Sequence, residues 1–287
     1  MNLFDDIKLH YKMGGFEQKL IYWNVCVFLL SVALFYKFKV GFFDYPDWLY
    51  LSSYWNIALY KPWTLLTYSF LHSDIWHLFF NMMVLNFAGR LFLTFFTQKQ
   101  LLGVYLLSAI FAALTFVAVY YAMGMQGEMI GASGAVMAIL IAAATYAPTM
   151  QLRFLLIGSV KLWHVAGVLL LLDLLYILAD NTGGHIAHLS GAFFGFVYVK
   201  LLQNGTDLTK GVTSILNFFA NLFSRNKKAP LKTVHRNYDR KPEKTASKIV
   251  TKDKTQQQID EILDKISQSG YDSLTKEEKE FLFKAGK

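Results

Sequence analysis

Six long apolar runs constrain the fold of this chain more than any other feature. They cover residues 20–38, 75–96, 101–123, 131–148, 163–180 and 185–202. Each approaches the length of about 20 residues that an α-helix needs to cross the hydrocarbon core of a bilayer. Of the 287 residues, 54% are hydrophobic and only 17% are charged, which is more apolar than one soluble core requires. The sequence therefore predicts an all-α, polytopic membrane protein with six transmembrane helices.

The connections between the runs predict how the helices are arranged. Residues 39–74 are rich in tryptophan and tyrosine but are interrupted by glycine and proline, so we expect an interfacial loop. Only residues 181–184 separate the last two runs, which predicts that these helices lie side by side and antiparallel. Basic residues in the short connections favour cytoplasmic N- and C-termini. With this orientation, the polar residues of the second, fourth and sixth runs lie at one depth, in the outer half of the bilayer.

The composition divides the chain into four parts. We expect a cytoplasmic N-terminal segment (1–19), a membrane domain (20–202), a basic cytoplasmic linker (203–254) and a small soluble helical hairpin (255–287). The tail carries most of the net charge of +8, because 18 of the 28 Lys and Arg residues lie from Lys200 onward. Such a tail can contact anionic lipid headgroups or remain a solvated linker. The basic residues of the tail are mixed with acidic ones, which argues against nucleic-acid binding. The N-terminal segment lacks the features of a signal or transit peptide, so we expect no cleavage.

Residues 255–287 have the pattern of two short helices. Ile259, Ile262 and Ile266 recur at helical spacing, and Thr275 with Glu278 forms a capping box that opens a second helix. The hairpin is a candidate site for a cytoplasmic partner, or else a stabilising appendage.

Polar side chains inside the runs mark a candidate site. His77 and Asn81 are one helical turn apart on one face, and an Asn amide at membrane depth can stabilise an oxyanion or hydrogen-bond another helix. Ser133 stands between Gly131 and Gly134 at the start of the fourth run. Small residues let helices approach closely, so this tetrapeptide alone also fits a packing role.

The sixth run supplies a partner for the serine. His188 is followed by Gly191 and Gly195 on nearly the same face. Two helices packed through such small-residue faces would bring Ser133 within reach of His188, and a serine hydroxyl becomes a nucleophile when a histidine takes its proton.

Other polar residues admit different interpretations. His72, His77, His185 and His188 could gather around zinc, but no HExxH motif accompanies them, so we predict no metal and no cofactor. Asp173 is an intramembrane acid and therefore a candidate functional residue, but we place it about one and a half turns deeper than the site and favour a structural hydrogen bond to a neighbouring helix. We expect His185 to face the loop or water, with a role as an alternative base left open.

The combined pattern resembles the rhomboid family of intramembrane serine proteases. It consists of His72-x4-His77-x3-Asn81, Gly131-x-Ser133-Gly134 and Ala187-His188-x2-Gly191-x3-Gly195, in this order over residues 20–202. The resemblance implies that Ser133 is the nucleophile and His188 its general base, without a third acid. It also implies an oxyanion hole made by His77, Asn81 and the Ser133 backbone N–H. Trp63 resembles the tryptophan of the family's long first loop.

Three positions depart from the pattern of many bacterial members. Thr64 stands where they carry Arg after the tryptophan, and Leu93 where they carry Glu, which removes structural polar contacts. Met137 replaces a Tyr that stacks on the catalytic His in some relatives, and it can still pack against an imidazole. None of these changes removes a catalytic group.

The resulting hypothesis is a serine endopeptidase that cleaves within or next to transmembrane segments of membrane-protein substrates. Residues 39–74 and the fifth run, with Trp163, are candidates for lateral access. The absence of a recognisable targeting segment and the compact core of six predicted spans favour a bacterial plasma membrane, with an organellar membrane left open. The alternative function is a non-catalytic membrane chaperone or scaffold that binds transmembrane clients, although such relatives usually lack the serine or the histidine.

Overall fold

The computed structural model describes residues 2–154, 158–179, 181–223 and 254–285, and the chain divides into two compact units, Met1–Asn226 and Lys227–Lys287. The α-helices of the first unit are α1 (Leu3–Met13), α2 (Phe16–Phe35), α3 (Trp55–Tyr60), α4 (Thr64–Thr67), α5 (Ile75–Leu93), α6 (Gln98–Met123), α7 (Ser133–Tyr146), α8 (Leu162–Tyr176), α9 (Thr182–Gln203) and α10 (Thr209–Phe223). Those of the second unit are α11 (Lys254–Ser269) and α12 (Lys276–Ala285). The predominantly helical fold confirms the predicted class.

Short strands form three antiparallel pairs in the described part of the first unit. They are β1 (Tyr36–Lys37) with β2 (Phe42–Phe43), β3 (Leu51–Ser52) with β4 (Glu128–Met129), and β5 (Gln151–Phe154) with β6 (Gly158–Lys161). In the β3–β4 pair, Leu51 is opposite Met129, so the long loop is fastened to the segment that leads into α7.

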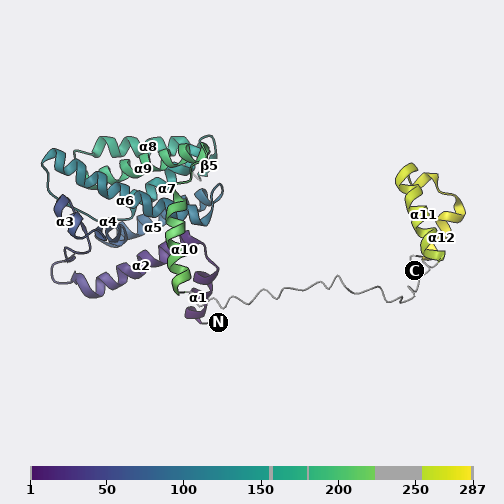
Figure 1. Cartoon of the computed structure of the whole chain (residues 1–287), viewed down its shortest axis with the longest axis horizontal. Helices are drawn as coiled ribbons and strands as arrows, with labels where there is room; N and C mark the ends of the chain where they lie inside the picture. The colour runs from purple at the N-terminus through teal and green to yellow at the C-terminus, as the bar shows by residue number, and fades with distance from the viewer. Residues whose placement is uncertain (1, 155–157, 180, 224–253, 286–287) are drawn as a thin grey trace, which may run out of the picture. The chain divides into compact units, whose positions relative to one another are not determined.

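Helices α2, α5, α6, α7, α8 and α9 occupy the six predicted apolar runs (Figure 1). By length and composition, α2, α6 and α9 can each cross a membrane, and α7 and α8 are shorter apolar helices. The count of six spans stays a prediction. Residues 39–74 contain only short elements and no spanning helix, as expected.

Helix α7 lies at the centre of the bundle. All its residues from Gly134 to Ala144 are buried, and it packs against α5, α6, α8 and α9. Many of these residues are alanine or glycine, so the surrounding helices can approach its backbone. Because α7 is fixed by packing on several sides, the position of Ser133, its first residue, is fixed as well.

Two caps fix the helices that carry the candidate site. The Asp74 carboxylate accepts a hydrogen bond from the backbone N–H of His77 at 2.8 Å and so begins α5. Asn181, with a φ of 45°, accepts from the N–H of Gly184 at 3.2 Å and begins α9. Each cap satisfies a donor that the first turn of a helix leaves without an intrahelical partner.

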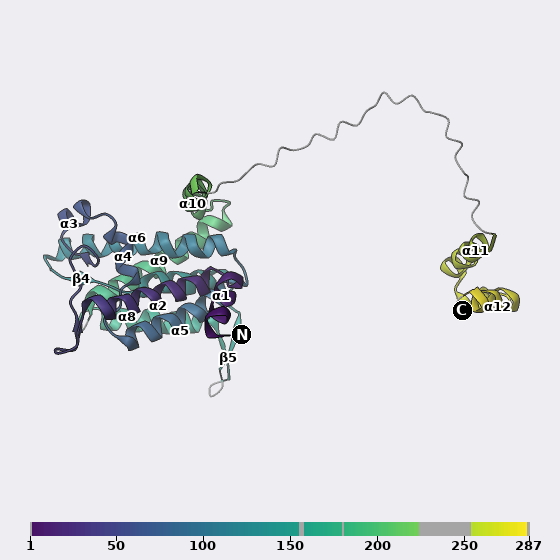
Figure 2. The ribbon, with the colours of Figure 1, turned by 90° about the horizontal axis from the view of Figure 1, so that it is seen from below.

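Helix α10 is an addition to the predicted elements, because its residues lie within the predicted linker, 203–254. It packs against α6, and a Cβ on Gly103 of α6 would lie 2.5 Å from the side chain of Thr209. Figure 1 shows α10 running across the helices of the bundle, and Figure 2 shows it on the outside of the bundle, beside α6. The apolar residues of α10 are interrupted by Thr213, Ser214, Asn217 and Asn221, which concealed their helical spacing.

The second unit contains the predicted hairpin. Helices α11 and α12 are joined by a turn in which Gly270 has a φ of 78°. The Thr275 hydroxyl accepts from the N–H of Glu278, and the Glu278 carboxylate accepts from the N–H of Thr275 at 2.7 Å, which confirms the capping box. Lys265 of α11 donates to Glu278 at 2.8 Å and links the two helices.

Candidate active site

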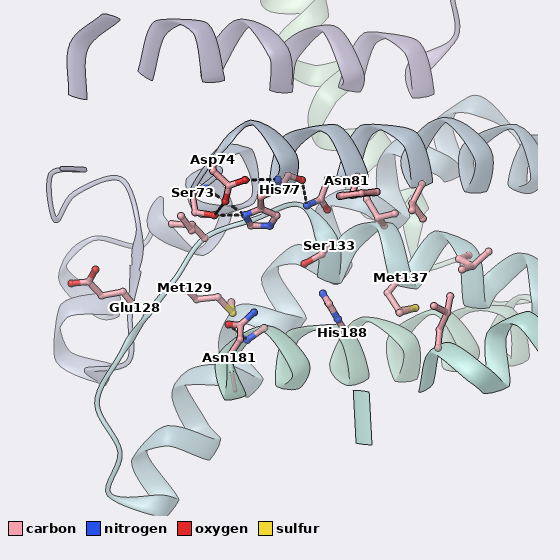
Figure 3. A pocket seen from close by; sticks show the side chains of 17 residues that line it. Ser73, Asp74, His77, Asn81, Glu128, Met129, Ser133, Met137, Asn181 and His188 are labelled. Atoms are coloured by element: carbon pink, nitrogen blue, oxygen red, sulfur yellow. Dashed lines mark hydrogen bonds between the residues drawn. The ribbon is translucent and has the colours of Figure 1, made fainter. Parts of the chain in front are cut away.

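A cavity of about 610 Å³ opens among α5, α7, α8 and α9 (Figure 3). Its polar lining comprises Ser73, Asp74, His77, Asn81, Glu128, Ser133, Asn181 and His188. Its apolar lining includes Phe80, Val84, Met137, Leu140 and Leu169. The structure therefore brings the four predicted site side chains from three different helices into one space.

Ser133 is placed by the start of α7. Ala132, which precedes it, provides no side-chain cap, and the first N–H groups of a helix have no acceptor within that helix. The backbone N–H of Ser133 is therefore suited to bind a negatively charged oxygen. Figure 3 shows Ser133 and the imidazole of His188 on facing walls of the cavity.

Gly131 keeps the space beside the serine open. Its φ of 122° favours glycine, and its N–H donates to the Tyr68 carbonyl at 2.9 Å. A Cβ at this position would lie 2.9 Å from Nε2 of His77 and 3.8 Å from Oγ of Ser133. The imidazole of His77 and the serine hydroxyl thus border the same small volume, which a side chain at Gly131 would fill.

Helices α7 and α9 approach each other through glycines, as the small-residue pattern predicts. A Cβ on Gly191 would lie 1.9 Å from the carbonyl oxygen of Gly134, and a Cβ on Gly195 would lie 2.2 Å from that of Ala138. A Cβ on Gly134 would be 3.0 Å from the Ala187 carbonyl oxygen. The two backbones are therefore in direct contact next to Ser133 and His188.

His77 and Asn81 project from the first turns of α5. The Asn81 amide donates one hydrogen to the His77 carbonyl at 2.9 Å, which leaves its second amide hydrogen for another acceptor. Nδ1 of His77 accepts a hydrogen bond from the Ser73 backbone N–H at 3.4 Å and lies 3.0 Å from the Ser73 hydroxyl, which is also 2.7 Å from a carboxylate oxygen of Asp74. These contacts hold the His77 ring by its Nδ1 edge and turn Nε2 toward Gly131.

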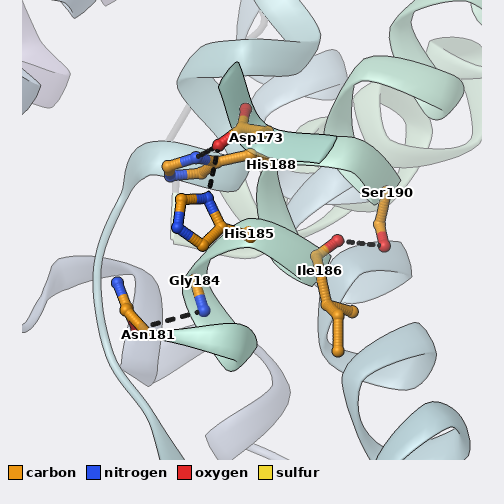
Figure 4. A network of polar contacts seen from close by, with 7 residues as sticks. All are labelled: Asp173, Asn181, Gly184, His185, Ile186, His188 and Ser190. Atoms are coloured by element: carbon orange, nitrogen blue, oxygen red, sulfur yellow. Dashed lines mark hydrogen bonds and ion pairs between the residues drawn. The ribbon is translucent and has the colours of Figure 1, made fainter. Parts of the chain in front are cut away.

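Asp173 belongs to the site, which corrects the sequence-based expectation. Its side chain is only 8% exposed, and its Oδ1 lies 2.8 Å from Nδ1 of His188 and 2.8 Å from Nδ1 of His185 (Figure 4). The expected structural hydrogen bond to a neighbouring helix exists, but its partner is the candidate base itself. His185 likewise contacts Asp173 rather than only loop or water.

The depth argument failed because it ignored the symmetry of the α8–α9 hairpin. Asp173 lies eight residues before Asn181, and His188 lies seven residues after it. With a rise of about 1.5 Å per residue, these positions are about 12 and 10.5 Å from the turn. Residues equidistant from the turn of an antiparallel hairpin lie opposite each other, so the spacing could have identified the pair.

The four histidines of the zinc alternative do not form one ligand cluster in the described part of the chain. The rings of His72 and His77 are 5.0 Å apart, and those of His185 and His188 are 6.1 Å apart. The described group with metal-ligand spacing is instead Asp173, His185 and His188. Both Nδ1 atoms lie at hydrogen-bond distance from one carboxylate oxygen, an arrangement that the carboxylate and two N–H donors satisfy without a cation.

His72 is buried next to the ring of His77, and neither of its ring nitrogens has a hydrogen-bond partner among the described residues. Burial, and to a smaller extent the positive charge of His77, lowers the pKa of His72 to about 3. His72 is therefore a neutral packing residue at physiological pH.

The fold and the cavity define a multi-pass helical membrane protein with a polar site inside its helix bundle. A model of the rhomboid domain matches residues 60–204, about half of the chain, and this stretch contains all the residues that line the cavity. The chain therefore belongs to the rhomboid family, whose members are generally intramembrane serine proteases. Residues 250–284 match a second family, DUF6576, whose function is unknown.

Curated relatives agree with this assignment. The chain is 31% identical over 145 residues to the mitochondrial presenilin-associated rhomboid-like proteins of Bos taurus and Homo sapiens. It is 32% identical over 136 residues to presenilin-associated rhomboid-like protein A of Danio rerio, also mitochondrial. The matches cover 50% and 46% of this chain and 38% and 35% of the respective relatives. The chain thus spans well under two thirds of the length of these proteins.

Proposed function

We propose that this protein is an intramembrane serine endopeptidase that cleaves within or next to transmembrane segments of membrane proteins. The observation that carries this proposal is the convergence of Ser133, His188, His77 and Asn81 on one cavity of a rhomboid-family chain. A packing role alone would not require a serine, two imidazoles and an amide to face the same solvent-accessible space.

The first half of the reaction forms an acyl-enzyme. Nε2 of His188 takes the proton of the Ser133 hydroxyl while Oγ attacks the carbonyl carbon of the scissile bond. The tetrahedral intermediate then collapses, the C–N bond breaks, and His188 returns the proton to the leaving amine. Water deprotonated by the same Nε2 next attacks the ester, which releases the carboxylate product and regenerates Ser133.

The negative oxygen of each tetrahedral intermediate needs donors that are already in place. The Ser133 N–H, the free amide hydrogen of Asn81 and an N–H at Nε2 of His77 are the three candidates around this position. Substrate helices must unwind locally before cleavage, because an intact helix hydrogen-bonds its own scissile carbonyl. Small and helix-breaking residues near the cut are the expected substrate preference.

Basic residues support a cytoplasmic location of both termini. Figures 1 and 2 show α1 and β5 at one end of the bundle and α3 at the other. Lys8, Lys12 and Arg153 lie at the α1 and β5 end, the end that the positive-inside rule assigns to the cytoplasm. We extend the proposal to a bacterial plasma membrane, with the bilayer and transmembrane substrates as the partners.

Cleavage by the purified full-length protein in liposomes tests the function. A transmembrane reporter and a fluorophosphonate probe, which acylates activated serines, should both react with wild type and fail to react with Ser133→Ala. His188→Ala should lose both reactions as well. Ser190→Ala is the matched control, because Ser190 is buried on α9 and donates to the Ile186 carbonyl at 2.6 Å, away from the cavity.

The two possible negative results differ in meaning. Labelling and cleavage that persist in Ser133→Ala would overturn the serine assignment. A folded wild type that neither cleaves nor labels, but binds transmembrane peptides, would favour the chaperone or scaffold alternative.

A further inference from the structure

The contact between α8 and α9 goes beyond a serine–histidine pair. Asp173 lies among leucines on α8, an environment in which an ionised carboxylate is costly unless it is hydrogen-bonded. One of its oxygens meets two imidazoles from α9, each at 2.8 Å through Nδ1 (Figure 4). These two hydrogen bonds stabilise the buried carboxylate of Asp173. They also determine which ring nitrogen of each imidazole carries a proton.

The carboxylate determines the tautomer of His188. A carboxylate can only accept hydrogen bonds, so the contact at Nδ1 requires a proton on Nδ1. A neutral imidazole with its proton on Nδ1 has an unprotonated Nε2, which is the form that can accept a proton from a serine. His188 lines the cavity opposite Ser133. The free lone pair is therefore on Nε2, the nitrogen that is proposed to take the serine proton.

His185 completes the arrangement from the side away from the serine. It precedes His188 by three residues on α9 and donates to the same oxygen, and its ring stacks on Tyr176 at 6.4 Å. It is absent from the cavity lining. Its role is therefore to hold the carboxylate, which in turn holds His188.

We propose that Asp173 is a positioning residue that fixes the orientation and Nδ1–H tautomer of His188, with His185 anchoring the carboxylate. This inference rests on the proposed function. The negative charge also stabilises the imidazolium that forms when Nε2 takes the serine proton. The site is thus a serine–histidine–aspartate arrangement in which the acid is supplied by a neighbouring helix.

The test compares Asp173→Asn and Asp173→Glu with wild type in the full-length protein reconstituted in liposomes. Asn keeps the size of the side chain but offers an N–H in place of one oxygen, so kcat should fall by at least about 100-fold with KM within about twofold. Glu retains a carboxylate on a longer arm and should recover at least about tenfold of that loss. The nitrogen chemical shifts of His188 in isotope-labelled protein should change from an Nδ1–H to an Nε2–H signature in Asp173→Asn.

A second pair of variants tests the proposal independently, in case Asp173→Asn does not fold. His185→Asn keeps an amide N–H close to the place of Nδ1, whereas His185→Leu removes the donor. His185→Leu should lose several-fold more kcat than His185→Asn, and Ser190→Ala should retain wild-type kcat and thermal midpoint.

The outcomes separate this inference from the proposed function. Retention of kcat within threefold in Asp173→Asn, or an unchanged His188 tautomer, would overturn the role of Asp173. An inactive wild type would contradict the proposed function, and the His188 nitrogen shifts would then still decide whether Asp173 sets the tautomer.

Discussion

A single methyl group on Gly191 should separate the two helices that carry Ser133 and His188. The added Cβ would lie 1.9 Å from the carbonyl oxygen of Gly134, and ordinary van der Waals contact begins at 3.4 Å. The obstacle is backbone, so no side-chain rotation relieves it. The helices must move apart by about 1.5 Å, the difference between these two distances.

This displacement acts directly on the proposed catalytic pair. Gly134 follows Ser133 immediately, and Gly191 lies three residues after His188 on the same helix. A misplacement of about 1 Å can cost about 100-fold in rate, so kcat of Gly191→Ala should fall by at least that factor. Overpacking should also lower the free energy of unfolding by about 1–3 kcal/mol.

The assay combines reporter cleavage with thermal unfolding of the detergent-solubilised protein. Gly167→Ala is the matched control, because it is also a helical glycine and a Cβ there meets no atom within 4 Å. That change should leave kcat unaltered and stabilise the fold by about 0.4–1 kcal/mol. Gly195→Ala, one turn farther from the pair, should destabilise the fold with a smaller loss of kcat. Wild-type kcat and midpoint in Gly191→Ala would refute the reasoning.

Other perturbations probe the remaining parts of the molecule. Asn81→Ala should lower kcat by about 10²–10³-fold, the cost of one oxyanion donor, and unchanged turnover would exclude this role. Gly131→Ala should abolish the proposed cleavage and cost about 1–3 kcal/mol of backbone strain, as checked by kinetics and denaturation. Below pH 6.5 the unfolded chain protonates His72 and the folded chain does not, so the free energy of unfolding should fall by about 1.4 kcal/mol per pH unit toward pH 3. His72→Gln should remove that slope in chemical denaturation. In the hairpin, hydrogen bonds from Lys265 and then from the Thr275 backbone lower the pKa of Glu278. Its stabilising contribution is therefore complete above the unfolded pKa and lost as pH falls through the lowered value. The amide hydrogen-exchange protection factors of α11 and α12 should fall at low pH in wild type but not in Glu278→Gln.

Periodicity and spacing in the sequence predict the helices and much of the cavity. The apolar runs locate α2 and α5 to α9, because burial in a bilayer or a helix bundle leaves a long apolar signature. His77 and Asn81 follow from their one-turn spacing, and the glycines of α9 follow from the small-residue pattern. These are local properties of single helices, which a sequence displays directly.

Contacts between helices were less accessible to prediction. The partnership of Asp173 with His185 and His188 depends on the register of α8 against α9, and counting from the turn would have been needed to find it. Helix α10 was missed because threonine, serine and asparagine interrupt its apolar residues, so its segment was assigned to the polar linker. Both cases involve side chains whose partners come from another segment, so no single window of sequence contains the information.

The division of the polar network between two helices links substrate access to chemistry. The fifth apolar run was a candidate for lateral access, and it forms α8, which carries Asp173, whereas α9 carries His188. A hydrogen bond of 2.8 Å does not survive a separation of more than about 1 Å. Movement of α8 away from α9 would thus release the imidazole from its carboxylate at the moment a substrate helix enters. Bond cleavage would have to wait until α8 returns, so a transmembrane segment that merely passes between these helices would leave uncut.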